Sequence, residues 1–455
     1  MKALKNTLKE IGRYPSAVFG VIIILLLVVL AIYAMVTIPY GEAIHLWRGT
    51  EDTAYKNPKN APPIWYNLFS KKQLPVSFAV NSADEGSEFT KVVTPTSTGN
   101  TMEFDYTFNF EADEPPQELS LYITSKYEKK NPFLSITMTV PGQEGPVKIA
   151  DLGAAAKMTY RFAQDDRLVT RLDRLHGRKI GRVMDTLFSV FKSDPLAMNK
   201  GDYTIKVVVT TFEPDSNVDL EFVVNGKVFG FFGTDHMRRD LKTPMLWGAP
   251  IALAFGFIAA IGTSVLSMFI AAIGAWFGGW LDELIQRITE INMILPFLPI
   301  LIMVGTFYNR SLWTILGVTI LLSIFTGAIK TNRAIFLQVK ESTYIEAAKA
   351  YGAGDFRIII KYLIPRIIPL LIPGLVSAVP SYVFLEASLA LLGLGDPVLP
   401  TWGKVINDAH THGAHFQGMY YWILEPAVLL TITGLGFAML GFALDRIFNP
   451  RLRGM

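Results

Sequence analysis

The sequence has 455 residues, of which 51% are apolar, with a formal net charge of +3 and no cysteine. This length allows more than one domain, and the mean hydropathy of +0.33 is unusual for a soluble protein. The near balance of charge excludes the concentrated basic surface that nucleic-acid binding needs. The absence of cysteine excludes disulfides, thiolate metal sites and thiol nucleophiles.

The charged residues are distributed unevenly along the chain. Of the 39 acidic residues, 27 lie between Gly41 and Lys242. We therefore expect three parts: residues 1–40 with a first membrane span, a polar insert at 41–242, and an apolar remainder at 243–455.

Long uncharged stretches predict membrane spans. The first, Val18 to Ile38, is long enough to cross a hydrocarbon core of about 30 Å as a helix. Basic residues precede it, as in a secretory signal, but its apolar stretch is longer than the core of such a signal, so we expect an uncleaved anchor. The next, Thr243 to Leu281, is too long for one upright helix and suits a span with a helical or re-entrant extension. The other candidate spans are Ile291 to Asn309, Ser311 to Ile329, Ile367 to Leu385 and Met419 to Leu444. This pattern predicts an all-α polytopic membrane domain with six transmembrane helices.

The positions of Lys and Arg predict the orientation, because positive loops are retained in the cytoplasm. Lys2, Lys5 and Lys9 precede the first span, and the tail carries Arg446, Arg451 and Arg453. The loop from Lys330 to Arg366 has seven basic and three acidic residues. With six spans, these three segments all lie in the cytoplasm, and the polar insert lies outside.

The insert has the pattern of a β-rich domain. Runs rich in Val, Ile, Thr, Tyr and Phe predict strands at Leu119 to Ser125, Leu134 to Val140, Tyr203 to Thr211 and Val218 to Phe229. Asn225-Gly226 is a hairpin-turn signal, and the apolar spacing from Gly181 to Lys192 predicts one covering helix. We expect a β-sandwich outside the membrane. The basic residues from Arg167 to Arg182 are typical of a solvated face, with an acidic partner or lipid headgroups as the alternative.

The loop after the fourth span has features of a lever. Ser342 to Tyr351 is rich in helix formers, with Ser342 or Thr343 as an N-terminal cap and Gly352 and Gly354 to end the helix. Its alanines leave the helix slim enough to enter a groove on another protein, and Glu346 adds one directional charge. The sequence predicts a short helix that receives force from a partner.

The spacing within this loop resembles the cytoplasmic coupling loop of ABC importer permeases. The matching positions are Glu346, Ala347, Ala348, Gly352 and Pro365, and the resemblance implies that they couple the chain to the cleft of an ATPase subunit. Tyr362 departs from the general pattern.

Other stretches are similar to the dipeptide, oligopeptide and nickel branch of that family, specifically to its second, C-type permease subunit. They are Gly233 to Asp240, with Arg238 where Gly is usual, Gly278 to Arg287, Glu386 to Gly403 and Asp445 to Arg451. This resemblance implies the type I ABC importer permease fold in the cytoplasmic (inner) membrane. The implied partners are a second homologous permease, two ATP-binding subunits and an extracytoplasmic substrate-binding protein. Residues 41–232 have no counterpart in a typical member.

ATP binding is expected on the partners. The sequence contains no Gly-rich turn ending in Gly-Lys-Ser/Thr, which a P-loop needs to cradle phosphate. We therefore expect ATP and Mg²⁺ on the ATPase subunits and no cofactor in this chain.

Two polar sites have competing interpretations. Glu386 and Ser388, near the end of the fifth span, either line the pathway or pack a subunit interface, because a charge in a span must face a partner, a cavity or water. His410, His412 and His415 are weak metal-ligand candidates, but their spacing fits no closed tetrahedral template, so we expect no metal.

The sequence therefore favours a permease subunit that forms half of a translocation pathway in an ATP-driven importer. Peptides are the favoured substrate, although the branch also handles nickel chelates and oligosaccharides. The alternative from another class is a membrane-anchored sensor or adhesion protein whose β-domain binds an external ligand. An exporter half is disfavoured because the loop resembles those of importers.

Overall fold

A computed structural model describes residues 12–49, 54–84, 86–97, 99–190 and 197–448. The chain divides into two units, which we call the membrane unit (Met1–Arg48 and Thr243–Met455) and the β unit (Gly49–Lys242). Several residues used in the sequence predictions lie outside the described residues: Lys2, Lys5, Lys9, Lys192, Arg451 and Arg453.

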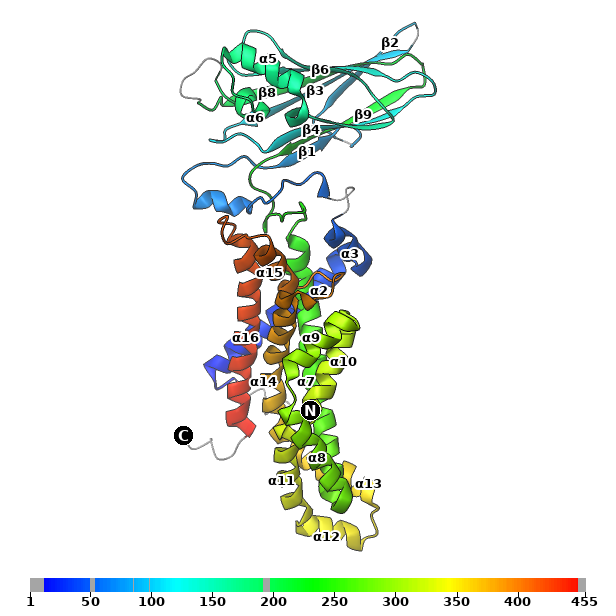
Figure 1. The fold of residues 1–455 in the computed structure, drawn as a ribbon, viewed down its shortest axis with the longest axis vertical. Helices are drawn as coiled ribbons and strands as arrows, with labels where there is room; N and C mark the ends of the chain where they lie inside the picture. The colour runs from blue at the N-terminus through cyan, green and yellow to red at the C-terminus, as the bar shows by residue number, and fades with distance from the viewer. Residues whose placement is uncertain (1–11, 50–53, 85, 98, 191–196, 449–455) are drawn as a thin grey trace. The chain divides into compact units, whose positions relative to one another are not determined.

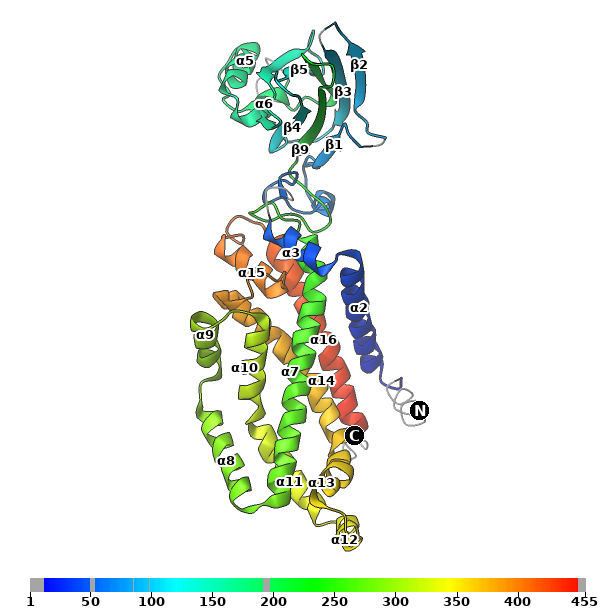
Figure 2. The same cartoon turned by 90° about the vertical axis from the view of Figure 1, so that its right-hand side faces the viewer.

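The membrane unit is built from helices (Figures 1 and 2). These are α2 (Pro15–Thr37), α3 (Tyr40–Arg48), α7 (Lys242–Phe277), α8 (Gly279–Ile294), α9 (Phe297–Phe307), α10 (Leu312–Ile324), α11 (Gly327–Lys340), α12 (Thr343–Ala350), α13 (Asp355–Ile358), α14 (Ile364–Leu389), α15 (Trp402–Thr411) and α16 (Tyr421–Phe448). Two π-helical turns, η3 (Ile359–Leu363) and η4 (Ala390–Leu394), flank α14.

Helix α16 packs along both α2 and α14, as both views show. Glycines permit the close approach of α2 and α16. A Cβ on Gly20 would lie 2.7 Å from the carbonyl oxygen of Gly436, and a Cβ on Gly436 would lie 2.6 Å from the side chain of Ile23. Small residues are the usual means by which helices approach in a membrane, where burial of apolar surface does not drive association.

Within the described residues, four helical segments are long and apolar enough to cross a membrane: Pro15–Thr37, Lys242–Phe277, Asp355–Leu394 and Tyr421–Phe448. Two bent pairs, α8 with α9 at 79° and α10 with α11 at 47°, bring the number to six if each pair is one span. The chain is a multi-pass membrane protein.

The third and fourth predicted spans are interrupted, and the second continues into a further helix as its length suggested. The uncharged stretch from Thr243 to Leu281 is not one helix, because Gly278 has a φ of 63° between α7 and α8. Pro296 separates α8 from α9, as expected of a residue that disfavours helix in its predecessor. At the bend between α10 and α11, Asn292 donates its amide to the carbonyls of Leu322 (2.7 Å) and Phe325 (2.8 Å). The broken helix is therefore supplied with hydrogen-bond partners that the bilayer core lacks.

The β unit contains two antiparallel sheets. Its strands are β1 (Phe78–Asn81), β2 (Thr90–Pro95), β3 (Asn100–Phe110), β4 (Glu118–Lys126), β5 (Phe133–Thr139), β6 (Val147–Gly153), β7 (Lys157–Arg161), β8 (Gly201–Thr210) and β9 (Asn217–Asn225). The strand orders are β1-β9-β4-β7 and β2-β3-β8-β5-β6.

One apolar core lies between the two sheets. Rings of Tyr106 and Phe108 on β3 lie 6.2 Å and 5.9 Å from the ring of Phe222 on β9, in the other sheet. Alternate residues of β3 and β8 are buried, as the period of a strand requires. Helices α5 (Asp166–His176) and α6 (Val183–Leu187) add Leu168, Leu172 and Leu187 to this core. Short 3₁₀ turns occur at η1 (Ile64–Leu68) and η2 (Phe162–Gln164).

The four predicted strands are found as β4, β5, β8 and β9, but the predicted hairpin is wrong. Strand β9 ends at Asn225, and its neighbours β1 and β4 both precede it in the chain. A Cβ on Gly226 would lie 2.2 Å from the carbonyl oxygen of Pro75. Position 226 therefore requires glycine because two backbone segments pass closely there. Close backbone approach is a role of glycine in strand regions that is distinct from forming a hairpin turn.

The helix prediction for Gly181 to Lys192 is wrong in extent. The structure forms only α6, after which Ser189 makes a β-bridge with Met198. The longer helix of this region, α5, was missed. Its N-terminus is capped by Asp165, whose Oδ1 accepts the N–H groups of Arg167 (2.9 Å) and Leu168 (3.1 Å).

Candidate functional site

The helix predicted for the loop after the fourth span forms as α12, with an N-terminus different from that expected. Ser342 occupies the N-cap position, but its hydroxyl donates back to the carbonyl of Val339, so the predicted side-chain cap is wrong. The C-terminus has a Schellman arrangement. Gly352 has a φ of 73°, its N–H donates to Lys349 O (2.9 Å), and the Ala353 N–H donates to Ala348 O (3.0 Å).

Helix α12 has one buried face and one exposed face. Ile345 is fully buried and Ala348 is 7% exposed, and both belong to the core cluster of this part of the membrane unit. Glu346, Ala347 and Gly352 are exposed. Of the three residues of the Glu-Ala-Ala sequence, two are thus presented to solvent and the third holds the helix to its own chain.

Exposed aromatic side chains extend this surface. Tyr351 is 93% exposed and Phe356 is 66% exposed. The sequence analysis missed both, although an aromatic residue at the end of a helix in a polar loop is a detectable signal. Tyrosine and phenylalanine are enriched where proteins dock.

Trp276, at the end of α7, contacts the segment that contains α12 and α13. Its indole N–H donates to Asp355 Oδ1 over 3.1 Å, and the ammonium of Lys349 lies 4.7 Å from its ring centroid. The ammonium of Lys340 donates to the backbone carbonyls of Ala275 (3.1 Å) and Trp276 (2.8 Å). The sequence did not single out Trp276, because one aromatic residue in an apolar run has no distinguishing pattern.

An ion pair joins α8 and α11, the helices that precede α12. Arg333 on α11 donates to both carboxylate oxygens of Asp282 on α8, with Nε–O distances of 2.7 Å and 2.9 Å. Its Nη2 also donates to Asp282. Such a bidentate pair fixes orientation as well as charge.

Pro365 is exposed and is the second residue of α14, which follows the π-helical turn η3. Proline has no N–H to donate, and a local π-helical adjustment is one way in which a membrane helix satisfies the backbone groups that proline leaves free. The segment from Asp355 to Leu394 is one candidate span despite the interruption.

Glu386 and Ser388 point in different directions. Glu386 is 5% exposed. It lines a cavity of about 10 Å³ together with Arg310 and Asp396. Ser388 is exposed, and its hydroxyl donates to Phe384 O over 2.7 Å. The structure therefore does not bring these two residues together.

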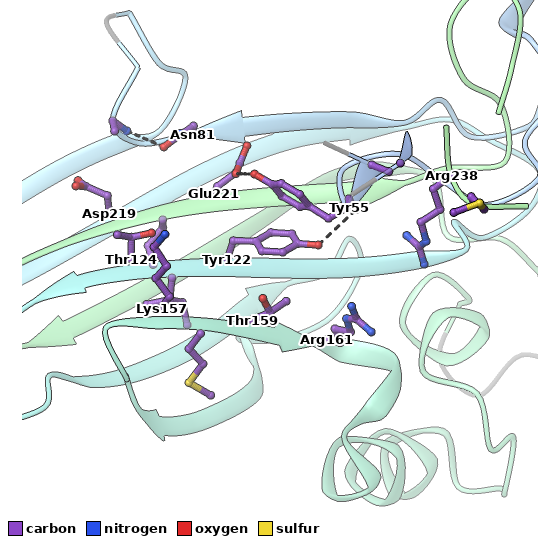
Figure 3. Close-up of a pocket in the computed structure, with 17 residues that line it drawn as sticks. Tyr55, Asn81, Tyr122, Thr124, Lys157, Thr159, Arg161, Asp219, Glu221 and Arg238 are labelled. Carbon is purple, nitrogen blue, oxygen red and sulfur yellow. Dashed lines mark hydrogen bonds between the residues drawn. The ribbon is translucent and has the colours of Figure 1, made fainter. Parts of the chain in front are cut away.

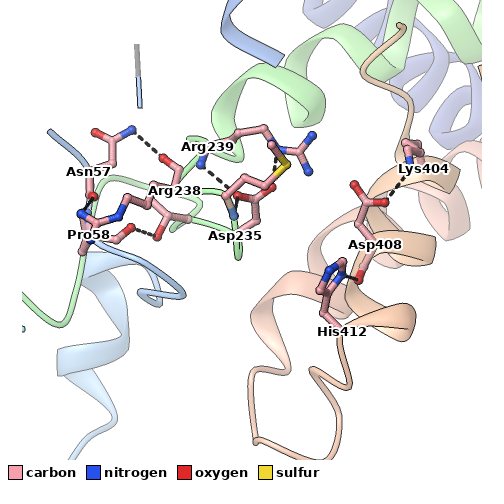
Figure 4. Close-up of polar contacts among 10 residues, drawn as sticks. Asn57, Pro58, Asp235, Arg238, Arg239, Lys404, Asp408 and His412 are labelled. Atoms are coloured by element: carbon pink, nitrogen blue, oxygen red, sulfur yellow. Dashed lines mark hydrogen bonds and ion pairs between the residues drawn. The ribbon is translucent and has the colours of Figure 1, made fainter. Parts of the chain in front are cut away.

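Of the three histidines of α15 and the following loop, two stack on each other and the third lies against Trp422. His412 Nδ1 lies 2.8 Å from Asp408 O, and its ring stacks on Trp422. His410 and His415 stack on each other with centroids 5.8 Å apart. Lys404 and Asp408 form an ion pair at 2.6 Å (Figure 4). Within the described residues, no group of three or more potential ligands is arranged to hold a metal ion.

The turn from Gly233 to Asp240 in the β unit is built around Asp235 (Figure 4). Asp235 is fully buried, and its carboxylate accepts the N–H of Met237 (2.8 Å) and the Nε–H of Arg239 (2.5 Å). Arg238 has a φ of 64°, in the region that favours glycine. This explains physically why glycine suits that position. Here the arginine donates to Asn57 O (3.1 Å) and Glu118 Oε2 (3.3 Å).

Comparison with known proteins gives consistent results. Residues 263–454 match the family model described as "Binding-protein-dependent transport system inner membrane component". The dipeptide transport system permease protein DppC of Bacillus subtilis (strain 168) is 31% identical over 224 residues, which are 49% of this chain and 69% of that protein.

Two further relatives extend the comparison. The oligopeptide transport system permease protein OppC of the same organism is 31% identical over 228 residues, which are 49% of this chain and 72% of that protein. The glutathione transport system permease protein GsiD of Escherichia coli O6:K15:H31 is 25% identical over 276 residues, which are 58% of this chain and 89% of that protein.

Proposed function

Because this chain belongs to the binding-protein-dependent transport system inner membrane components, the permease subunits of ABC importers, we propose how its parts serve peptide import. It is a transport subunit and not an enzyme, since its relatives are permeases. The named relatives carry dipeptides and oligopeptides, so peptides are the substrate class proposed for this chain.

The observation that carries the mechanism is the two-faced helix α12. Its exposed face, with Glu346, Ala347 and Gly352, is the surface we assign to an ATPase partner. Its buried face packs through Ile345 and Ala348 into the membrane unit. A force applied to the exposed face therefore acts on the helix packing behind it, because packed cores transmit displacement.

Two routes lead from α12 into the spans. One passes through Trp276 to α7, by the contacts with Lys349 and Asp355. The other passes through α13 and η3 to α14, where Pro365 marks the junction. Closure of the partners would move both helices together and change the access of the pathway, as alternating access requires. The ATP and Mg²⁺ of this cycle belong to the partner subunits.

The proposed architecture follows the same family pattern. Each bent helix pair forms one span, which gives six spans with both termini in the cytoplasm. The β unit lies outside the membrane as a β-sandwich, supported by the core that its two sheets share. A second permease completes the pathway, two ATPases bind inside, and a substrate-binding protein delivers peptide outside.

A cross-link tests the docking surface directly. The chain contains no cysteine, so Ala347→Cys creates one unique thiol on the exposed face of α12. We expect a short bifunctional reagent to join this thiol to the ATPase in the assembled transporter. Ala348→Cys is the matched control, because that position is buried one residue away. Equal cross-linking at both positions would contradict the assignment.

A membrane-anchored sensor makes the opposite prediction on purification. A sensor would purify without an ATPase, whereas the permease should bring two such subunits with it. Peptide-loaded binding protein should also stimulate hydrolysis by the purified complex. Absence of both effects would favour the sensor.

A further inference from the structure

The outer face of the four-stranded sheet contains a cavity of about 780 Å³ (Figure 3). This volume lies within the range typical of small-molecule and short-peptide sites. Residues of all four strands line it, and the segments around Tyr55 and Arg238 form its remaining walls. The whole cavity belongs to the β unit.

The register of the sheet determines which side chains face the cavity. Tyr122 on β4 lies opposite Glu221 on β9 and Thr159 on β7. Thr124, two residues after Tyr122 on β4, lies opposite Asp219 on β9 and Lys157 on β7. Because strand side chains alternate between faces, these residues all project to the face opposite the apolar core.

The wall at Tyr55 is fixed by aromatic and polar contacts. The rings of Tyr55 and Tyr122 lie 4.4 Å apart at a tilt of 58°. The Tyr55 hydroxyl donates to Glu221 Oε2 over 2.9 Å. Burial and the Glu221 carboxylate raise the pKa of Tyr55 above its ordinary value. Tyr55 therefore remains a neutral donor, and the aromatic pair offers a rigid surface to a ligand.

The acidic side chains of the cavity already have cationic partners. Glu221 pairs with Lys56, and Asp219 pairs with Lys91 over 3.0 Å. On the basic side, Arg238 pairs with Glu118 over 3.3 Å. Lys157 and Arg161, both exposed on β7, make no ion pair among the described residues. The charge left for a ligand is thus positive and comes from one strand.

We propose that this cavity binds a short peptide through its C-terminal carboxylate, which the guanidinium of Arg161 holds. The inference rests on the proposed peptide-import function. Arginine matches the planar geometry of a carboxylate with two parallel N–H bonds. Lys157 and Arg161 are four residues apart on an extended strand, a separation of about 13 Å. That length suits an extended peptide of about three or four residues.

The remaining lining fits the body of such a peptide. Thr159 lies between the two cations, and Thr124 lies beside Lys157, so hydroxyls are available to the peptide backbone. Tyr122 supplies an aromatic surface to a peptide side chain. An inorganic anion would use Arg161 but not the aromatic surface of Tyr122. The β unit would thereby hold peptide before it enters the pathway.

Fluorescence anisotropy of the full chain, purified in lipid nanodiscs without its partners, tests this site. The probe is the tripeptide Ala-Phe-Ala carrying an N-terminal fluorescein, compared with the same peptide amidated at its C-terminus. We expect the amide to bind at least about tenfold more weakly, the effect of losing a charged hydrogen-bonded pair. Equal binding of acid and amide would overturn the proposal, and so would complete displacement by equimolar inorganic phosphate.

Two variants locate the effect. Arg161→Gln should weaken binding of the free-acid probe to the level of the amidated probe. Arg167 lies on α5 outside the cavity, so the Arg167→Gln variant should bind the free-acid probe as the wild type does. Wild-type binding by Arg161→Gln would contradict the assignment. The acid–amide comparison uses the unaltered chain and so holds even if a variant misfolds.

Failure here is distinguishable from failure of the proposed function. Peptide uptake by the assembled transporter without peptide binding by the isolated chain would overturn only the cavity assignment. Binding without uptake would contradict only the import function.

Discussion

Trp276 donates its indole N–H to the carboxylate of Asp355 over 3.1 Å, joining residues 79 positions apart in the sequence. The same ring lies beside the ammonium of Lys349, at 4.7 Å from its centroid. The end of α7, helix α12 and the start of α13 are thereby linked at one side chain. This link makes α7, and not only α14, a recipient of force in the proposed mechanism.

Replacing Trp276 with Phe should distinguish the effect of the hydrogen bond to Asp355 from that of the ring contact with Lys349. The variant loses the hydrogen bond to Asp355 but keeps an aromatic ring for Lys349, and such a bond contributes about 1 kcal/mol. We expect about a fivefold loss of peptide uptake per ATP hydrolysed in the reconstituted transporter. Trp280→Phe is the control, because that indole is 74% exposed. A similar loss in both variants would refute the specific role of Trp276.

Gly352 should be sensitive to side chains because of its backbone conformation. Its φ is 73°, and no neighbour lies within 4 Å of an added Cβ, so the penalty of a side chain is conformational and not steric. Gly352→Ala should destabilise the end of α12 by about 1 kcal/mol, and Gly352→Asn should cost less. Hydrogen exchange of the Gly352 and Ala353 amides measures this effect.

Gly354→Ala is the matched control for that prediction. Gly354 is two residues away, has a φ of −70° and also has open space around an added Cβ. Its substitution should leave exchange at Gly352 unchanged, whereas equal effects of the two alanines would contradict the backbone explanation.

The Asp282–Arg333 pair should act as a unit. Arg333→Lys retains the positive charge but loses the bidentate geometry, so it should still destabilise the membrane unit. A double-mutant cycle of Asp282→Asn and Arg333→Gln should give a coupling of about 1 to 3 kcal/mol in thermal unfolding. Lys330→Gln tests a nearby exposed pair, Lys330 with Glu290 at 3.6 Å, and should change stability by under about 1 kcal/mol. A coupling free energy near zero would contradict the claim that the Asp282–Arg333 pair stabilises the membrane unit.

Glu213 should make one turn of the β unit sensitive to acid. Its carboxylate accepts the N–H groups of Glu128, Lys129 and Lys130 over 2.7, 2.8 and 2.9 Å. The bond from Glu128, followed by the other two, holds the pKa of Glu213 below its ordinary value of 4.5. A carboxyl with a lowered folded pKa stabilises above its unfolded pKa, and this stabilisation is lost as pH falls through the folded value.

Hydrogen exchange at residues 128–130 measures that loss. Protection, after correction for intrinsic rates, should be high at neutral pH and fall below about pH 4. Glu213→Gln should exchange quickly at both pH values, whereas Glu144→Gln, an exposed carboxyl of another turn, should behave as wild type. Unchanged protection in Glu213→Gln would contradict the assignment.

Periodicity and turn chemistry predicted the elements whose stability is local. The apolar stretches became helices, the alternating runs became β4, β5, β8 and β9, and Gly352 ends α12 by the expected left-handed turn. Positions decided by tertiary contact were less predictable. Gly226 looked like a hairpin residue, but its neighbour in space, Pro75, lies far away in the sequence.

The same distinction holds for the candidate site. Spacing identified the loop but not its inner supports, since Trp276 and Arg333 become informative only once α7 and α11 lie beside their partners. Nor did the sequence reveal that Ala348 packs inward while Ala347 is exposed, because a short alanine-rich helix has no amphipathic pattern.

The most direct test of the central claim is ATP-driven uptake of radiolabelled peptide into vesicles containing the complete transporter. The wild-type chain should support accumulation. Gly352→Trp should insert normally and leave ATP hydrolysis running without uptake, while Gly354→Trp should still transport. Wild-type accumulation in Gly352→Trp, or no accumulation by the complete wild-type transporter, would contradict the account.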